Sequence, residues 1–109
     1  MEKDIIKALY ETVESRRREP QEGSYTCYLF DQGIDKICKK VGEEAAETII
    51  AAKNGSSEEL TAEICDLIYH LTVLMSEAHV PYEAVAAELE RRSAKIGNLK
   101  KLKTVDRNT

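Results

Sequence analysis

Residues 34–53 read IDKICKKVGEEAAETIIAAK, and this stretch decides the fold. The pair Asn54-Gly55 that follows predicts a helix C-cap, and Ser56, with Glu59 three residues later, predicts the capped start of another helix. This next helix is expected to reach about residue 79, so residues 34–79 predict a hairpin of two helices. In residues 34–53 the apolar side chains recur at the 3.6-residue period and form one stripe: Ile34, Ile37, Cys38, Val41, Ala45, Thr48, Ile49 and Ala52.

The other segments also predict helices. Apolar residues at helical spacing cover residues 4–18, and Ser24-Tyr25-Thr26 can cap a short helix that Gly33 closes. Pro81 fits the first position of a last helix that ends near residue 94. The predicted fold class is all-α, a bundle of four to five helices in one domain over residues 1–95. Residues 96–109 form a basic tail that is expected to be poorly ordered.

Composition narrows the class of protein. The 109 residues carry a formal net charge of -4, which is no general signature of nucleic-acid binding. The three cysteines, Cys27, Cys38 and Cys65, form no CxxC pair and suit reduced thiols in a cytoplasmic protein. The N-terminus lacks the apolar run of a signal peptide, and no apolar stretch is long enough to span a bilayer.

The helix expected over residues 57–79 is apolar on several faces. Its main stripe, which is expected to face the core, consists of Leu60, Ile64, Leu67, Leu71, Leu74 and Ala78. A helix that is apolar on several faces is covered on several sides. Because this chain is short, we expect a second subunit to supply the other cover, in a homodimer or a higher homo-oligomer, and Ile50 indicates the same. The residues left for that subunit are the mostly apolar ones off the stripe: Cys65, Tyr69, Thr72 and Val73.

Four acidic residues are the candidate functional site. Glu44 and Glu47 are three residues apart, and Glu63 and Asp66 repeat this spacing. Residues three apart share a helix face, so two antiparallel helices can bring all four carboxylates together at the edges of their apolar stripes. Carboxylates at close quarters repel one another, and a hard divalent ion such as Mg²⁺ is the expected occupant. The alternative is a solvated face of ion pairs, with Lys40 among them.

His70 falls between Glu63 and Asp66 in helical angle, one turn further along. It is read either as a core histidine with one hydrogen-bond partner or as a residue that orients a carboxylate or contacts substrate. Nothing in the sequence indicates a glycine-rich phosphate loop, a nucleophile elbow or an HExxH zinc motif.

The string Lys39-Lys40-x-Gly42-Glu43-Glu44-x-x-Glu47, followed by Asp66-Leu67-x-Tyr69-His70, resembles the phosphoribosyl-ATP pyrophosphohydrolase family. This family belongs to the all-α, MazG-like nucleotide pyrophosphohydrolases, whose shared signature is EExxE followed by ExxD. The segments 24–26 and 51–53 match as well, and the resemblance covers roughly residues 5–92. The basic tail does not match.

The resemblance implies hydrolysis of 1-(5-phosphoribosyl)-ATP between its α and β phosphates, which gives 1-(5-phosphoribosyl)-AMP and pyrophosphate in the second step of histidine biosynthesis. It implies that Glu44, Glu47, Glu63 and Asp66 hold one or more Mg²⁺ ions, with Glu43 as an outer base or a further ligand. On the substrate side it implies that basic residues bind phosphates: Lys36, Lys40, Lys53, and Arg16 or Arg17. It implies that Ser24, Tyr25 and Thr26 contact ribose or a phosphate, and that His70 lies at the edge of the site.

Two other functions remain open at this point. A house-cleaning pyrophosphohydrolase that acts on free or damaged (d)NTPs would have the same fold and the same acids. A non-catalytic helical assembly module would have solvated acids and would use its apolar faces for oligomerisation.

Overall fold

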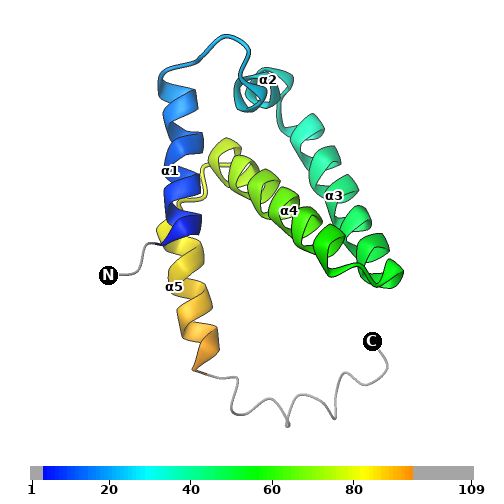
Figure 1. The fold of residues 1–109 in the computed structure, drawn as a ribbon. Helices are drawn as coiled ribbons and strands as arrows, with labels where there is room; N and C mark the ends of the chain where they lie inside the picture. Colours follow the sequence, from blue (N-terminus) through cyan, green and yellow to red (C-terminus); the bar gives the residue numbers. More distant parts are fainter. Residues whose placement is uncertain (1–3, 95–109) are drawn as a thin grey trace.

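A computed structural model describes residues 4–94, and the regular structure of this part of the chain is entirely helical (Figure 1). The all-α prediction is therefore confirmed. The predicted basic tail, residues 96–109, lies outside the described residues. The helices are α1 (Ile5–Arg18), α2 (Tyr25–Gln32), α3 (Ile34–Asn54), α4 (Ser57–Glu77) and α5 (Tyr82–Ser93).

Local capping sets the helix boundaries. The side chains of Asp4, Ser24 and Ser56 each accept a hydrogen bond from a backbone N–H in the first turn of α1, α2 and α4. Gly55 ends α3 with a φ of 77°, a left-handed conformation that glycine adopts without strain. Pro81 is the N-cap of α5, one position before the first helical residue at which it was predicted.

Helices α3 and α4 form the predicted antiparallel hairpin and pack along their length (Figure 1). Helix α1 packs on the C-terminal half of α4, and α2 joins α1 to α3 at the end of the hairpin. The four helices share a small core, to which each contributes one fully buried residue, and α5 runs away from it and buries none of its own residues. The core residues are Val13, Leu29, Ile37 and Val73.

The faces that pack within the chain overlap only in part with the predicted apolar stripes, through Ile37 of α3 and Leu74 of α4. On α3 the buried residues are Ile37, Glu44 and Ala51, whereas Ile34 and Ile49 are 44% and 64% exposed. The centre of the packed face is rotated from the centre of the stripe by about 80°, and Ile37 belongs to both. Glu44, at the edge of the apolar stripe, therefore lies in the middle of the face that meets α4.

On α4 the assignment of faces is reversed. Ile64 and Leu71 of the main stripe are 41% and 39% exposed, so the prediction that this stripe faces the core is wrong. The residues buried within the chain are His70, Thr72, Val73 and Ser76. Thr72 donates a hydrogen bond to a backbone carbonyl of α4, and Ser76 donates to Glu14 of α1 over 2.5 Å, so this polar face is satisfied where α1 covers it.

None of the described helices is long and apolar enough to cross a membrane.

Candidate active site

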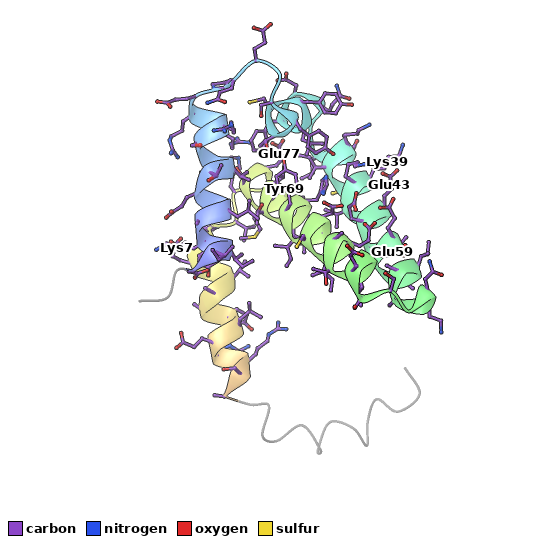
Figure 2. All side chains as sticks on the ribbon, in the orientation of Figure 1. Lys7, Lys39, Glu43, Glu59, Tyr69 and Glu77 are labelled. Carbon is purple, nitrogen blue, oxygen red and sulfur yellow. The ribbon has the colours of Figure 1, made fainter. Side chains whose placement is uncertain are left out.

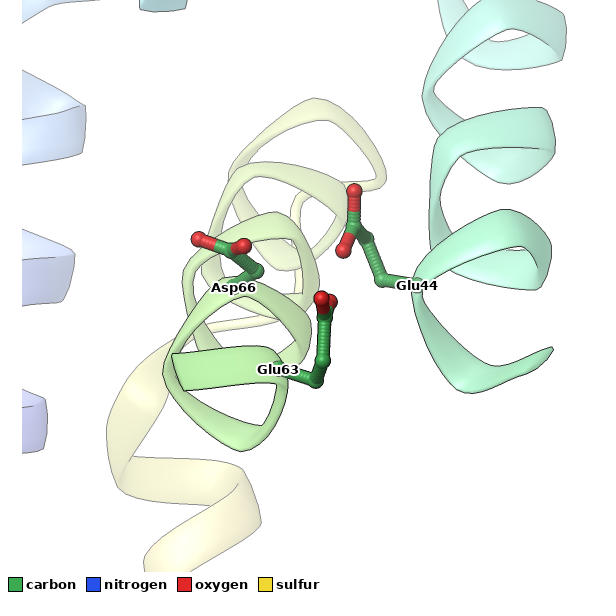
Figure 3. A group of neighbouring side chains, drawn as sticks. All are labelled: Glu44, Glu63 and Asp66. Carbon is green, nitrogen blue, oxygen red and sulfur yellow. The ribbon is translucent and has the colours of Figure 1, made fainter. Parts of the chain in front are cut away.

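A group of three carboxylates lies between α3 and α4. Glu44 extends from α3 towards Glu63 and Asp66 of α4, which share a face because they are three residues apart (Figure 3). One carboxylate oxygen from each of the three lies within 4.8 Å of the others. Glu44 is 7% exposed and Glu63 is half-buried. The structure thus brings three of the four predicted carboxylates together.

The fourth acid, Glu47, is exposed and lies outside this group, one turn further along α3. The negative charge of Glu47 still reaches the group, since it helps to raise the pKa values of both Glu44 and Glu63. Glu43 is exposed on α3 (Figure 2) and pairs with Lys40 at 3.3 Å. The Lys40 ammonium also lies 4.0 Å from Glu44, so the surface ion pairs expected of this lysine exist beside the carboxylate group.

The carboxylate group has too few hydrogen-bond donors and positive charges around it to offset its negative charge. Oε1 of Glu44 and Oε1 of Glu63 are buried, and neither has a hydrogen-bond partner within residues 4–94. Burial raises the pKa of Glu44, and the charges of Glu47 and Asp66 raise it further. Burial, followed by Glu47 and Glu44, likewise raises the pKa of Glu63. A buried acceptor without a donor is costly, and oxygen ligands at this spacing suit a hard divalent cation.

His70 connects this group to α2. The imidazole is 5% exposed, and its Nδ1 lies 2.8 Å from the backbone carbonyl of Asp66. A carbonyl only accepts, so Nδ1 carries the proton in the neutral ring and Nε2 accepts from the Tyr25 hydroxyl at 2.9 Å. Thr26 and Tyr69 form a second hydrogen bond between the same two helices. His70 therefore has two partners, where the core-histidine interpretation expected one.

The remaining predicted substrate residues are spread along the fold. Ser24 caps α2 by accepting from the backbone N–H of Cys27. Lys36 and Lys53 lie on α3 about 12 Å and about 13 Å from Glu44 along the axis, in opposite directions. The Lys36 ammonium is 5.8 Å from the ring centroid of Tyr28, and Lys53 is exposed in the last turn of α3.

A cleft of about 1020 Å³ opens between the end of α1, the connection to α2, and α2 itself. Four of the predicted substrate residues line it: Arg16, Arg17, Ser24 and Tyr25. Gln21 and Tyr28 also line it and were not among the predicted residues. The spacing of Tyr25 and Tyr28, three residues apart on one helix, is the signal that would have placed Tyr28 on the same face. The three carboxylates do not line this cleft, and Tyr25 lies between the two.

Comparisons with known proteins agree over nearly the whole chain. A family model described as phosphoribosyl-ATP pyrophosphohydrolase matches residues 6–93, from the first turn of α1 to the end of α5. A phosphoribosyl-ATP pyrophosphatase of Clostridium botulinum (strain Kyoto / Type A2) is 51% identical over 105 residues, 95% of this chain and 96% of that protein. The Clostridium novyi (strain NT) protein of that name is 52% identical over 97 residues, 89% and 88% of the two chains. The Listeria monocytogenes serovar 1/2a (strain ATCC BAA-679 / EGD-e) protein is 49% identical over 102 residues, 94% and 98%.

Proposed function

The chain belongs to the phosphoribosyl-ATP pyrophosphohydrolase family, and we propose that it hydrolyses 1-(5-phosphoribosyl)-ATP to 1-(5-phosphoribosyl)-AMP and pyrophosphate. This reaction is the second step of histidine biosynthesis. The observation that carries the proposal is the group of Glu44, Glu63 and Asp66, in which two buried oxygens lack a donor within the described part of the chain. A reaction on a polyphosphate needs positive charge at this position, and the carboxylates are arranged to hold it.

Glu44, Glu63 and Asp66 are the proposed Mg²⁺ ligands, and Glu47 is the proposed fourth. Support for Glu47 comes from its charge, which acts on both Glu44 and Glu63 although its side chain lies outside the group of three. Bound Mg²⁺ would bind phosphate oxygens and offset the charge that develops on the pyrophosphate leaving group.

The chain's own residues bind and orient the polyphosphate. Lys40 lies at the edge of the carboxylate group, and its hydrogen bond to Glu43 raises its pKa, so its ammonium stays charged and can donate to phosphate oxygens. Glu43, held by this lysine, is proposed as the residue that takes the proton of the attacking water. His70 holds Tyr25 and the first turn of α2 beside Asp66.

We propose that the chain is a homodimer. Ile34 and Ile49 of α3 and Ile64 and Leu71 of α4 are all exposed apolar residues. On each helix these residues lie about a quarter turn, in the same sense of rotation, from the residues that meet the other helix. Because the two helices are antiparallel, such residues lie on the same side of the hairpin. α1 covers the opposite side of α4 in its C-terminal half. An exposed apolar face shared by two helices is typical of a subunit interface.

The three cysteines are free thiols, which suits a reducing compartment, and a cytoplasmic location is proposed on this basis.

Pyrophosphate release from phosphoribosyl-ATP in the presence of Mg²⁺ tests the function, with ATP and dATP as parallel substrates. Release confined to phosphoribosyl-ATP, and abolished by EDTA, is the expected result. Release mainly from dATP would assign the chain to house-cleaning chemistry on the same site. Absence of release from all three would reject the enzyme and leave the helical assembly module.

A further inference from the structure

The cleft next to the carboxylate group lacks an assigned ligand. Its volume of about 1020 Å³ reaches the upper end of the range of small-molecule sites, about 300–1,000 Å³. Tyr25 forms part of its wall, and one imidazole, that of His70, separates the Tyr25 hydroxyl from the backbone of Asp66. A substrate whose polyphosphate lies at the carboxylate group can therefore extend over Tyr25 into the cleft.

The two arginines that line the cleft differ in what they contact. Arg17 lies 3.0 Å from Glu77 and stacks on the Phe30 ring, with 4.7 Å from its guanidinium carbon to the ring centroid. Arg16 has no acidic partner within 4.0 Å in residues 4–94, and its one side-chain hydrogen bond there, over 3.4 Å, goes to Ser15. Arg17 is thus held in the fold, whereas the guanidinium of Arg16 can still bind an anion.

Arg16 also lies where two cavities meet. It lines both the cleft and an adjoining cavity of about 320 Å³, and Ser24 and Tyr25 line both as well. Its planar guanidinium can donate two parallel hydrogen bonds to a phosphate group. Three acids also line the cleft: Glu77 is paired with Arg17, and Glu22 and Asp31 are exposed to solvent, which screens their charge.

Aromatic rings form another part of the cleft wall. Tyr25 and Tyr28 stack with their ring centroids 6.1 Å apart and an interplanar angle of 23°, and each residue is 44% exposed. Exposed tyrosine rings offer a flat apolar surface on which a purine can stack.

We infer that this cleft is a second subsite, which takes the phosphoribosyl end of the substrate, with Arg16 on the 5′-phosphate and Tyr28 against the purine. The inference rests on the proposed function and deepens it. ATP and dATP lack the second ribose and its 5′-phosphate, so neither offers Arg16 a phosphate to bind in the cleft. The cleft is therefore the part of the enzyme that distinguishes phosphoribosyl-ATP from the common nucleotides, whereas the carboxylate group treats all of them alike.

The test compares Arg16→Met with Arg18→Met, a matched control at an exposed position of the same helix end that does not line the cleft. Arg16→Met is expected to lower kcat/KM for phosphoribosyl-ATP about 10- to 100-fold, mainly through KM, whereas Arg18→Met is expected to keep it. Arg16→Lys, which keeps the charge, is expected to lose less. Calorimetric binding of phosphoribosyl-AMP and AMP gives a second readout: Arg16→Met should abolish the preference for phosphoribosyl-AMP.

The outcomes separate this inference from the function on which it rests. Absence of pyrophosphate release from phosphoribosyl-ATP by the unsubstituted protein would reject the proposed function. Normal release, together with Arg16→Met kinetics that match Arg18→Met, would overturn only the subsite. Calorimetric affinities that Arg16→Met lowers equally for phosphoribosyl-AMP and AMP would overturn it as well, since they would place Arg16 on a group that the two nucleotides share. Should Arg16→Met not fold, the kinetics of Arg16→Lys and its calorimetric binding of phosphoribosyl-AMP and AMP decide.

Discussion

Glu44 of α3 and Glu63 of α4 face each other across the helix hairpin, and each keeps one buried carboxylate oxygen for which residues 4–94 supply no hydrogen-bond donor (Figure 3). Asp66 lies with them, and its charge and that of Glu47 add to the negative potential at Glu44. Two helices thus meet through side chains that repel one another. This repulsion lowers the stability of the ion-free protein and favours the binding of a cation.

The first prediction concerns pH and Mg²⁺. The pKa values of Glu44 and Glu63 are raised above the ordinary 4.5, so the folded protein holds these protons more tightly than the unfolded chain. The ion-free protein therefore gains this contribution to stability as the pH falls through the raised pKa values towards 4.5, and lacks it at neutral pH. Mg²⁺ competes with these protons, so its stabilising effect on the melting temperature should be large at neutral pH and should vanish near pH 4.5.

Thermal melts with and without MgCl₂ measure this effect, with NaCl at the same ionic strength as the control. A Mg²⁺ shift of the same size at both pH values would contradict a carboxylate site.

The second prediction concerns Glu44→Gln. The amide removes a buried charge and can donate to Glu63 or Asp66, so the ion-free protein should gain about 1 kcal/mol of stability, a rise of a few degrees in melting temperature. The same change should remove the Mg²⁺ shift and lower kcat/KM about 100-fold or more. Glu58→Gln, at an exposed position in the first turn of α4, is the control and should keep both the shift and the activity. Loss of stability in Glu44→Gln would indicate that the carboxylate stabilises the fold.

The third prediction concerns the hydrogen bond between Tyr25 and His70. Tyr25→Phe removes the hydroxyl that His70 Nε2 accepts, and the unpaired nitrogen should cost about 1 kcal/mol in urea unfolding. The first turn of α2 should then be held less firmly beside Asp66, with a lower kcat. Tyr28→Phe is the stability control, because no hydrogen bond of its hydroxyl is found within the described residues. Equal unfolding free energies for the two variants would show that the Tyr25–His70 contact contributes nothing.

The fourth prediction concerns oligomeric state. Light scattering during size-exclusion chromatography should give twice the chain mass of 12.3 kDa. Leu71→Glu should give the monomer, because it buries a charge in the apolar face that α3 and α4 share. Ala62→Glu, about 180° around α4 from Leu71, should leave the dimer intact. A dimer that survives Leu71→Glu would show that the subunits meet elsewhere.

Much of the fold follows from local sequence. Helix boundaries depend on contacts between neighbours in the chain: Ser24 and Ser56 cap the starts of α2 and α4, and Gly55 ends α3. The residue types at these positions were sufficient to predict the boundaries. The pairing of α3 with α4 follows from the short connection between them. The approach of Glu63 and Asp66 to Glu44 follows in turn from helical spacing within an antiparallel hairpin.

The rotation of each helix about its axis could not be predicted in this way. The apolar stripes of α3 and α4 led to the wrong packed faces, because what a face meets depends on every helix around it and on the partner subunit that we propose. Sequence periodicity reports only that a face is apolar, and Ile64 and Leu71 are apolar but exposed in the single chain.

Contacts between residues distant in the chain belong wholly to the tertiary structure. The hydrogen bond between Tyr25 and His70 spans 45 residues, and Arg17 reaches Glu77 across 60. The sequence by itself determined the helices, their caps and the carboxylates of one hairpin, since these depend on residues close together in the chain. Which arginine is paired and which faces the cleft was decided only when α1, α2 and α4 packed together, because adjacent arginines are chemically equivalent until their neighbours differ.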